Sequence, residues 1–420
     1  MMEQQPSTSS LLNLNYLTHP AYKPHYKSAD IESHFPLAVE KVCQSFDSMT
    51  TIKTVKELEN HFQTEAQKSL AQLQEIMLRH LTDNQARSAA LGALEKTSQD
   101  LYHRNLLRLT SRSDQNKSTA TSPPLDHLKE KRFSLTQVNS QSIKTMREDL
   151  DPYIQQIKAS SDRLQFNYRD IPLPMRGAFW SEAIKAIHNA GFLSAASQFL
   201  GYQVEPWYCA LGYAKSSDTW WHSPYSDIGL PTSDLTYLHV DKGYDIVKCI
   251  IYLDEVTEEN GPFSYFTGPP DERMKFQDQF YCYLDYEWVK RYKPDLPNPK
   301  QYYRKHCLSP KFREEFVNLP QFFRGSSHFG DDILNGSELS QSLLKNENKV
   351  TSDLGNCFLF FGSDLLHRGG MVKKGERLAL QLGFLQKRPF YKDLKKKAIN
   401  SAYQVLGDKT FRTVKSYLRS

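Results

Sequence analysis

Residues 237–241 read YLHVD, and the second half of the chain is organised around them. They lie just ahead of the apolar run Val247–Leu253 and place an imidazole and a carboxylate two residues apart. In extended backbone, the side chains of residues i and i+2 point to the same face, so His239 and Asp241 can reach one ion without distortion. The spacing predicts a pair of metal ligands beside a buried strand.

His367 completes the candidate metal site. It follows a second apolar run, Cys357–Phe361, so a strand would hold its imidazole rigidly. Two imidazoles and one carboxylate on one face of an octahedral ion leave three positions open, which is the arrangement of non-haem Fe(II) oxygenases. We therefore predict that His239, Asp241 and His367 bind a ferrous ion and carry the catalysis.

Arg377 indicates which co-substrate would use the open positions. It precedes a third apolar run, Leu378–Leu385. A guanidinium is always charged and binds a carboxylate through two parallel hydrogen bonds. One end of a 2-oxo acid would chelate the iron while the far carboxylate pairs with Arg377. The HxD spacing alone is weak, because thirteen histidines and 48 acidic residues give about one such match by chance. The combination of four residues is much stronger.

Three other histidines fit the site less well, because they stand in loop-like segments with no carboxylate two residues on: His222, His306 and His328. Two alternative functions stay open. The chain could be a non-catalytic binding or scaffold protein that acts through its N-terminal helices and basic tail, with an inactive barrel. The same triad could also hold a hydrolytic metal, which would leave Arg377 without a role.

Charge and cysteine content bound the class of protein. A formal charge of +5 is small for 420 residues, and no nucleic-acid partner is expected. Six cysteines without a CxxC pair indicate neither a disulfide framework nor a structural zinc site. No apolar run reaches transmembrane length, and the N-terminus lacks the basic start and apolar core of a secretory signal. We expect a cytoplasmic protein.

The C-terminal tail is basic. From Lys387 onward it holds ten Lys or Arg and two Asp, a local balance of +8. The ordinary interpretation is the solvated face of a helix at 391–420. The alternative is a docking surface for an acidic partner or a phosphorylated substrate.

Helical periodicity dominates the first half of the chain. Apolar residues recur every third or fourth position over Val55–Leu81, and a second helix is expected over Asn84–Leu109. Joined by a short turn, the two form a hairpin that is either a scaffold or a partner-binding module. Further helices are expected over Ile143–Ile157 and Trp180–Leu200, the latter ending at Gly201 in the left-handed conformation.

Short apolar runs with turn residues between them predict an antiparallel barrel or sandwich in the second half. Besides those named above, strands are expected at Tyr208–Tyr213 and Phe263–Thr267. The segment 271–350 interrupts the strands and includes an expected helix at Asp285–Tyr292. Together with Trp220 and Trp221, this insertion is a candidate substrate wall. The expected domain organisation is a flexible arm at 1–35, a helical hairpin region at 36–110, a linker at 111–125, an oxygenase domain at 126–390 and the basic helix.

Residues 238–385 resemble the phytanoyl-CoA dioxygenase-like branch of the Fe(II)/2-oxoglutarate oxygenases. The matching pieces are HVD at 239–241, IIYLDEVTEENGP at 250–262, and GNCFLFF at 355–361 followed by His367 and Arg377. The resemblance implies an α+β fold, a double-stranded β-helix (a jelly-roll, cupin-like barrel) with flanking helices and an N-terminal helical region. It also implies that His239, Asp241 and His367 bind iron and that Arg377 binds 2-oxoglutarate.

The implied reaction consumes O2 and 2-oxoglutarate, hydroxylates an aliphatic carbon of a small-molecule or acyl-thioester substrate, and releases succinate and CO2. Halogenating relatives replace the ligating carboxylate by a small residue, so the presence of Asp241 favours hydroxylation. The chain reads TGPP at 267–270 where the family usually has PGSH, and its insertion lengthens the gap between the ligands. These departures leave the substrate open.

Overall fold

The structure of the chain is a computed structural model. The described residues are 29–80, 84–110, 122–159, 166–172, 176–216, 234–235, 238–241, 243, 246–267, 279–280, 283, 287 and 335–386. The expected basic C-terminal helix and nearly all of the expected helix at 285–292 lie outside these ranges. So do Trp220, Trp221 and the three less suitable histidines.

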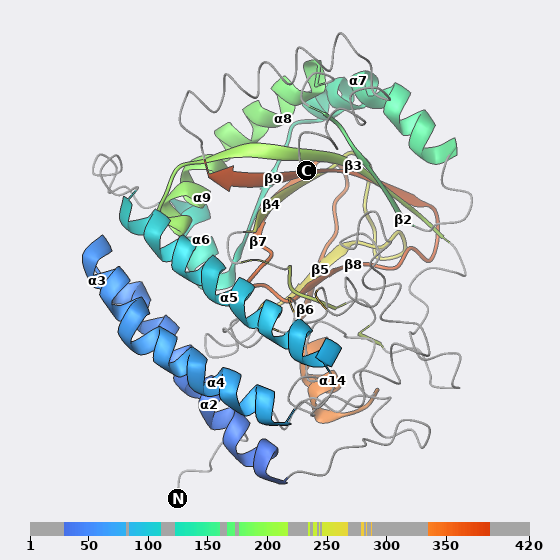
Figure 1. Ribbon diagram of the computed structural model, residues 1–420. Helices are drawn as coiled ribbons and strands as arrows, with labels where there is room; N and C mark the ends of the chain where they lie inside the picture. The colour runs from blue at the N-terminus through green and yellow to red at the C-terminus, as the bar shows by residue number, and fades with distance from the viewer. Residues whose placement is uncertain are drawn as a thin grey trace, which may run out of the picture.

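The N-terminal region is helical, as its periodicity predicts. α3 (Val55–His61) and α4 (Gln67–His80) are joined by a single π-helical turn at Phe62–Ala66, so the helical run predicted from Val55 is continuous but not purely α-helical. α5 (Asn84–Thr110) is the second predicted helix. In Figure 1, α5 lies between these outer helices and the rest of the molecule.

Two boundaries of this region differ from expectation. α2 (Ala29–Ser48) begins inside the stretch expected to be a flexible arm. α6 (Pro123–Lys131) begins inside the expected linker. The two prolines that marked a break instead start a helix, because the first turn does not need the N–H that proline lacks.

The helix predicted over Trp180–Leu200 is two helices. α8 (Ala178–Asn189) and α9 (Phe192–Leu200) are separated at Gly191, which takes a left-handed conformation with φ of 70°. Gly201 ends α9 with φ of 81°, which confirms the predicted cap. The longer α7 (Ser140–Ala159) covers the helix expected over Ile143–Ile157.

Within the described ranges, nine strands form two antiparallel sheets. The six-stranded sheet has the order β1-β7-β4-β9-β3-β2, and the three-stranded sheet has the order β6-β5-β8. The strand bounds are β1 Phe133–Gln137, β2 Phe166–Asp170, β3 Val204–Lys215, β4 Val247–Tyr252, β5 Phe263–Phe266, β6 Glu347–Val350, β7 Asn356–Phe361, β8 His367–Gly369 and β9 Glu376–Gln386.

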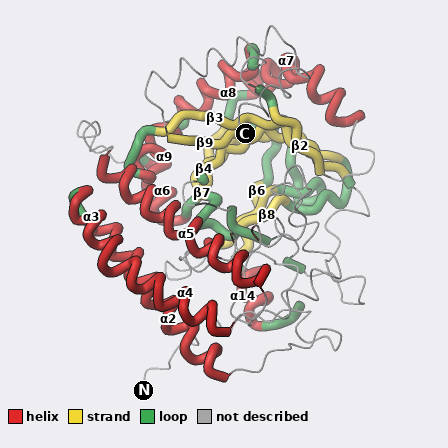
Figure 2. Tube along the Cα trace, viewed as in Figure 1, coloured by secondary structure: helices red, strands yellow, loops and turns green. Residues whose placement is uncertain are grey.

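This arrangement confirms an α+β protein with antiparallel sheets, but the described strands form two sheets rather than one closed barrel (Figures 1 and 2). β6 lies inside the expected insertion, which therefore ends before Glu347. Its sequence, ENKV, has no apolar pattern; pairing with β5 defines it as a strand. None of the described helices is both long and apolar enough to cross a membrane.

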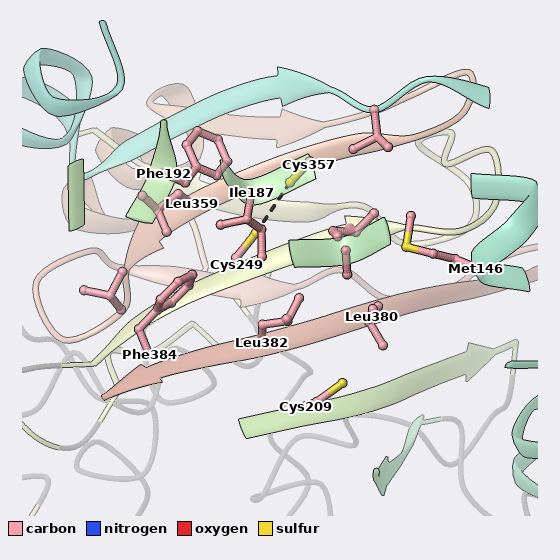
Figure 3. Close-up of a cluster of buried hydrophobic side chains, with 14 of the residues drawn as sticks. Met146, Ile187, Phe192, Cys209, Cys249, Cys357, Leu359, Leu380, Leu382 and Phe384 are labelled. Carbon is pink, nitrogen blue, oxygen red and sulfur yellow. Dashed lines mark hydrogen bonds between the residues drawn. The ribbon is translucent and has the colours of Figure 1, made fainter. Parts of the chain in front are cut away.

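The main core lies on the outer face of the six-stranded sheet. Side chains that alternate along β4, β7 and β9 pack there against residues of α7, α8 and α9 (Figure 3), and Figure 1 shows these helices beside the larger sheet. Fully buried members include Cys249, Leu359 and Leu380. A second cluster, which includes Phe263, Phe358 and Phe360, lies on the inner face. Because successive side chains of a strand point to opposite faces, the residues between the outward ones lie on the inner face.

Candidate metal centre

His239 and His367 are paired across the edge of the three-stranded sheet. Each donates its backbone N–H to the carbonyl of the other, at 2.9 Å from His239 and 2.8 Å from His367. Their ring centroids are 4.4 Å apart, and the residues are only 8% and 4% exposed. The backbone pairing fixes both imidazoles on one side, although they are 128 positions apart in the chain.

Asp241 joins the two histidines. Its backbone N–H donates to the carbonyl of Gly362 at 2.8 Å, which ties it to the end of β7. Its Oδ2 lies 3.6 Å from His367 Nε2. One ligand atom from each of His239, Asp241 and His367 lies within 4.8 Å of the others. Ligands that bind one ion at about 2.1 Å lie roughly 3–4 Å apart, so the three donors fit a shared metal ion.

The environment of His367 fixes which of its ring nitrogens could bind a metal ion. Its Nδ1 lies 2.7 Å from the backbone carbonyl of Leu365. Because a carbonyl only accepts, Nδ1 carries the proton in the neutral ring, and the lone pair is on Nε2. The ring also packs against Phe263 and Phe360, with centroid distances of 5.5 Å and 5.0 Å. These contacts hold the imidazole in one orientation.

Lys248 is a further residue at the site that the sequence reasoning missed. It lies on β4, and its Nζ donates to Asp241 Oδ1 at 2.6 Å. A single charged residue inside the otherwise apolar run Val247–Leu253 was the available signal. A lysine at an alternate position of a buried strand indicates an acidic partner inside the fold.

Gln279 was also missed, because it belongs to the expected insertion. Its Nε2 donates to the backbone carbonyl of Asp241 at 2.9 Å, and its Oε1 accepts from Gly243 N–H at 2.6 Å. The residue is fully buried. Tyr283, four residues on, hydrogen-bonds Asp100 of α5. This part of the insertion therefore connects the loop around Asp241 to the N-terminal helices.

Arg377 lies on the inner face at the start of β9 and is 6% exposed. Its Nη2 is 3.6 Å from the position that a Cβ would take on Gly369, two residues after His367. Among the described residues its buried Nη1 has no hydrogen-bond partner. A buried guanidinium with an unsatisfied N–H is costly unless an anion meets it. This position suits a carboxylate.

The hydroxyl of Tyr252 lies near the Arg377 guanidinium and was not predicted from the sequence. The residue is 1% exposed, and its oxygen accepts from the Phe263 backbone N–H at 2.8 Å. Burial raises the pKa of the Tyr252 hydroxyl to about 12, while the nearby Arg377 charge acts in the opposite direction. The hydroxyl therefore keeps its proton at neutral pH and can donate a hydrogen bond to an anion bound by Arg377.

Comparison with known proteins gives structural similarities only. No protein-family model and no curated protein matches the chain. Three similar solved structures are the α-ketoglutarate-dependent carbocyclase SnoK from nogalamycin biosynthesis, EctD from S. alaskensis with 2-oxoglutarate and 5-hydroxyectoine, and HygX from Streptomyces hygroscopicus with nickel and 2-oxoglutarate.

The three structures are remote from this chain in sequence. SnoK is 10% identical, with a TM-score of 0.33 over 64% of this chain and 85% of its own. EctD is 10% identical, with a TM-score of 0.35 over 66% and 81%. HygX is 13% identical, with a TM-score of 0.35 over 64% and 88%. TM-scores this low do not by themselves establish a common fold.

Proposed function

We propose that the chain is an Fe(II)- and 2-oxoglutarate-dependent dioxygenase. The observation that carries the proposal is the convergence, in one interior, of His239, Asp241 and His367 with the buried guanidinium of Arg377. The triad supplies three ligands to one ion, and Arg377 supplies a cation for an anion farther in. A 2-oxo dicarboxylate has one group for each, because its 2-oxo acid end can chelate a metal.

The path of the strands supports a double-stranded β-helix. From β4 to β9 the chain crosses repeatedly between the sheets: β4, β7 and β9 lie in the larger sheet, while β5, β6 and β8 lie in the smaller. His239 extends the smaller sheet by pairing with His367. Two facing antiparallel sheets connected in this way are typical of jelly rolls and cupins. The ligands then come from the edge of the smaller sheet and would hold an ion between the two sheets.

Each residue has a defined role in this proposal. His239, Asp241 and His367 hold the iron, and Arg377 with Tyr252 binds the far carboxylate of 2-oxoglutarate. When bound, the iron supplies the site for O2 activation, which couples conversion of 2-oxoglutarate to succinate and CO2 with hydroxylation of an aliphatic carbon. The aromatic rings on the inner face, Phe263 and Phe360 among them, exclude water around His367. The substrate would be a small molecule or an acyl thioester.

The same proposal assigns the chain to the phytanoyl-CoA dioxygenase-like branch, on the basis of the HVD and EENGP stretches. It also assigns the chain to the cytoplasm. The N-terminal helices are assigned as a scaffold for the barrel. α5 contributes Arg104, whose guanidinium lies 5.4 Å from the centroid of the Phe361 ring at the end of β7. A purely non-catalytic protein gives no reason for Arg377 to be buried beside the triad, and neither does a hydrolytic metal site.

The test is spectroscopic and anaerobic. Fe(II) and 2-oxoglutarate are added to the purified protein, and the weak visible charge-transfer band of a chelated 2-oxo acid is recorded. We expect a band in the wild type, no band in His367→Ala, and a band in Arg377→Ala only at about 100-fold higher 2-oxoglutarate, since losing one partner of a buried charge pair costs about 2–5 kcal/mol.

Two exposed residues give matched controls: His103→Ala on α5 and Arg79→Ala on α4, whose side chain is 64% exposed. Both variants should keep the wild-type band and midpoint. Absence of the band from folded wild-type protein would overturn the dioxygenase proposal and redirect attention to what the helices and the basic tail bind.

A further inference from the structure

Lys248 contacts a predicted iron ligand directly. It is the single charged residue of β4, and its Nζ lies 2.6 Å from Asp241 Oδ1. The side chains of Lys248 and Asp241 are 22% and 14% exposed, so the pair is largely shielded from water. An ion pair in this environment is screened less than a surface pair and holds its geometry better.

The two oxygens of the Asp241 carboxylate face different partners. Oδ1 accepts the hydrogen bond from Lys248, whereas Oδ2 lies toward His367, 3.6 Å from its Nε2. Gly362 packs against the same carboxylate so closely that a Cβ there would collide with Oδ2. The lysine on one side and the glycine backbone on the other therefore limit rotation of the carboxylate. Oδ2 is the oxygen that would face a metal ion shared with His367.

A carboxylate can bind a metal with one oxygen or with both. In the proposed reaction the difference matters, because three protein ligands leave three positions, of which 2-oxoglutarate needs two and O2 needs one. Two-oxygen binding by Asp241 would take one of these positions. A residue that occupies Oδ1 prevents this loss.

We propose that Lys248 is a positioning residue that reserves Asp241 Oδ1 and thereby holds Asp241 to single-oxygen ligation of the metal. The inference rests on the proposed function, since it concerns the positions left for 2-oxoglutarate and O2. Lys248 does not touch the ion itself. Its effect passes through the orientation of the carboxylate, as with other groups that hydrogen-bond a metal ligand.

The experiment counts open positions without using turnover. Mn(II) replaces iron, and water proton relaxation reports how many exchangeable waters it carries. The wild type should carry about three, because six octahedral positions less three protein ligands leave three. Lys248→Met has a similar length and no donor, so it should carry about two and bind 2-oxoglutarate about 10–100-fold more weakly, the usual effect of losing such a partner.

Two further variants control for charge and for folding. Lys248→Arg keeps a cationic donor and should keep three waters. Lys349→Met removes a lysine whose partner is the exposed Glu258, at 3.1 Å, and should change neither quantity. If methionine lowers the yield of folded protein, Lys248→Leu provides the same comparison, because leucine also lacks a donor.

Two results would overturn the inference. Lys248→Met could keep three waters and the wild-type affinity for 2-oxoglutarate, which would make the ion pair irrelevant to ligation. It could also keep three waters but bind 2-oxoglutarate weakly, which would mean that Lys248 contacts the co-substrate instead. Failure of the proposed function looks different, because the wild type itself would then bind no Mn(II) at this site.

Discussion

The two faces of the six-stranded sheet differ in chemistry, although the same strands supply both. Along β4 the outward residues Cys249 and Ile251 are fully buried under the helices, while the inward residues Lys248 and Tyr252 carry an ammonium and a hydroxyl. Both inward groups make hydrogen bonds on the inner side of the sheet, to Asp241 and to Phe263 N–H.

β9 repeats the pattern. Its outward residues Leu380 and Leu382 are fully buried, and its inward residues Arg377 and Gln381 are polar and less than 10% exposed. Burying polar groups costs free energy unless they find partners, whereas burying leucine contributes about 25 cal/mol per Å² of apolar surface. The two faces of the sheet therefore differ in role. The outward face stabilises the sheet, and the inward face holds polar groups that a bound ligand would satisfy.

The largest expected effect lies on the outward face. Leu380→Ala removes a fully buried side chain and leaves a cavity against the helices, so the free energy of unfolding should fall by about 2–5 kcal/mol. Urea denaturation measures the loss. The folded fraction should bind 2-oxoglutarate with wild-type affinity, because the side chain points away from the site. A parallel loss of affinity would show that the two faces are not independent.

A second substitution should mainly change metal affinity on the inward side of the sheet. Gly362→Ala places a methyl group where the Asp241 carboxylate lies, so the carboxylate must turn away from His367. Metal affinity, measured by Mn(II) titration, should fall about 10–100-fold, like other displacements of a ligand's support. Gly336→Ala is the control for glycine replacement away from the site: its φ of 76° strains an alanine, but a Cβ there meets nothing within 4 Å, so Mn(II) affinity should stay at the wild-type value. Equal Mn(II) affinity in the two variants would contradict the assigned role of Asp241.

Tyr252→Phe should weaken the binding of 2-oxoglutarate rather than the binding of the metal. It removes a charge-assisted hydrogen bond to the bound carboxylate, worth about 1.5–3 kcal/mol, and 2-oxoglutarate should bind at least about 10-fold more weakly. Isothermal titration with Mn(II)-loaded protein measures the change, and Tyr153→Phe on α7 is the control. An unchanged affinity would leave Arg377 as the sole contact.

The raised pKa of Tyr252 also predicts a pH dependence. Burial favours the neutral phenol, so the folded-state pKa of about 12 lies above the unfolded value of about 10. Its contribution to stability is therefore fully present below pH ~10 and is lost as the pH rises through the folded pKa. Thermal unfolding should show no step from this group near neutral pH. A step there that disappears in Tyr252→Phe would contradict the assignment.

The parts of the fold that the sequence predicted are those where periodicity is strong. Apolar runs such as Cys357–Phe361 became buried strands, and Gly201 ended a helix as its backbone freedom suggests. β6 and β8 carry no such pattern, since short strands are defined by pairing with distant partners rather than by their own residues. The break at Gly191 was missed because the helical spacing continues across it.

The grouping of the candidate ligands was predictable where a motif exists and not beyond it. The HxD spacing brought His239 and Asp241 together, and the distant His367 followed from its place after a strand. Lys248 and Gln279 could not be assigned in the same way, because their roles depend on which face of a strand, or which buried loop, meets Asp241. A lone charge in an apolar run indicates a partner but does not say which one.

The smallest expected effect concerns Glu376, the residue before Arg377, whose side chain points to the outer face of the sheet. Burial acts to raise the pKa of Glu376, but hydrogen bonds from Lys158 and Tyr213 outweigh it and the pKa is lowered. The Lys158 and Glu376 side chains are 33% and 41% exposed, so the pair contributes less than about 1 kcal/mol. Because the pKa of Glu376 is depressed, that contribution is present above the unfolded value of about 4.3 and is lost as the pH falls through the folded value.

Lys158→Met should therefore lower the free energy of unfolding slightly at pH ~7 and not at all in acid, while 2-oxoglutarate affinity stays at the wild-type value. A loss of affinity would mean that Glu376 and Arg377 act together, and that the two faces of β9 are coupled at this end.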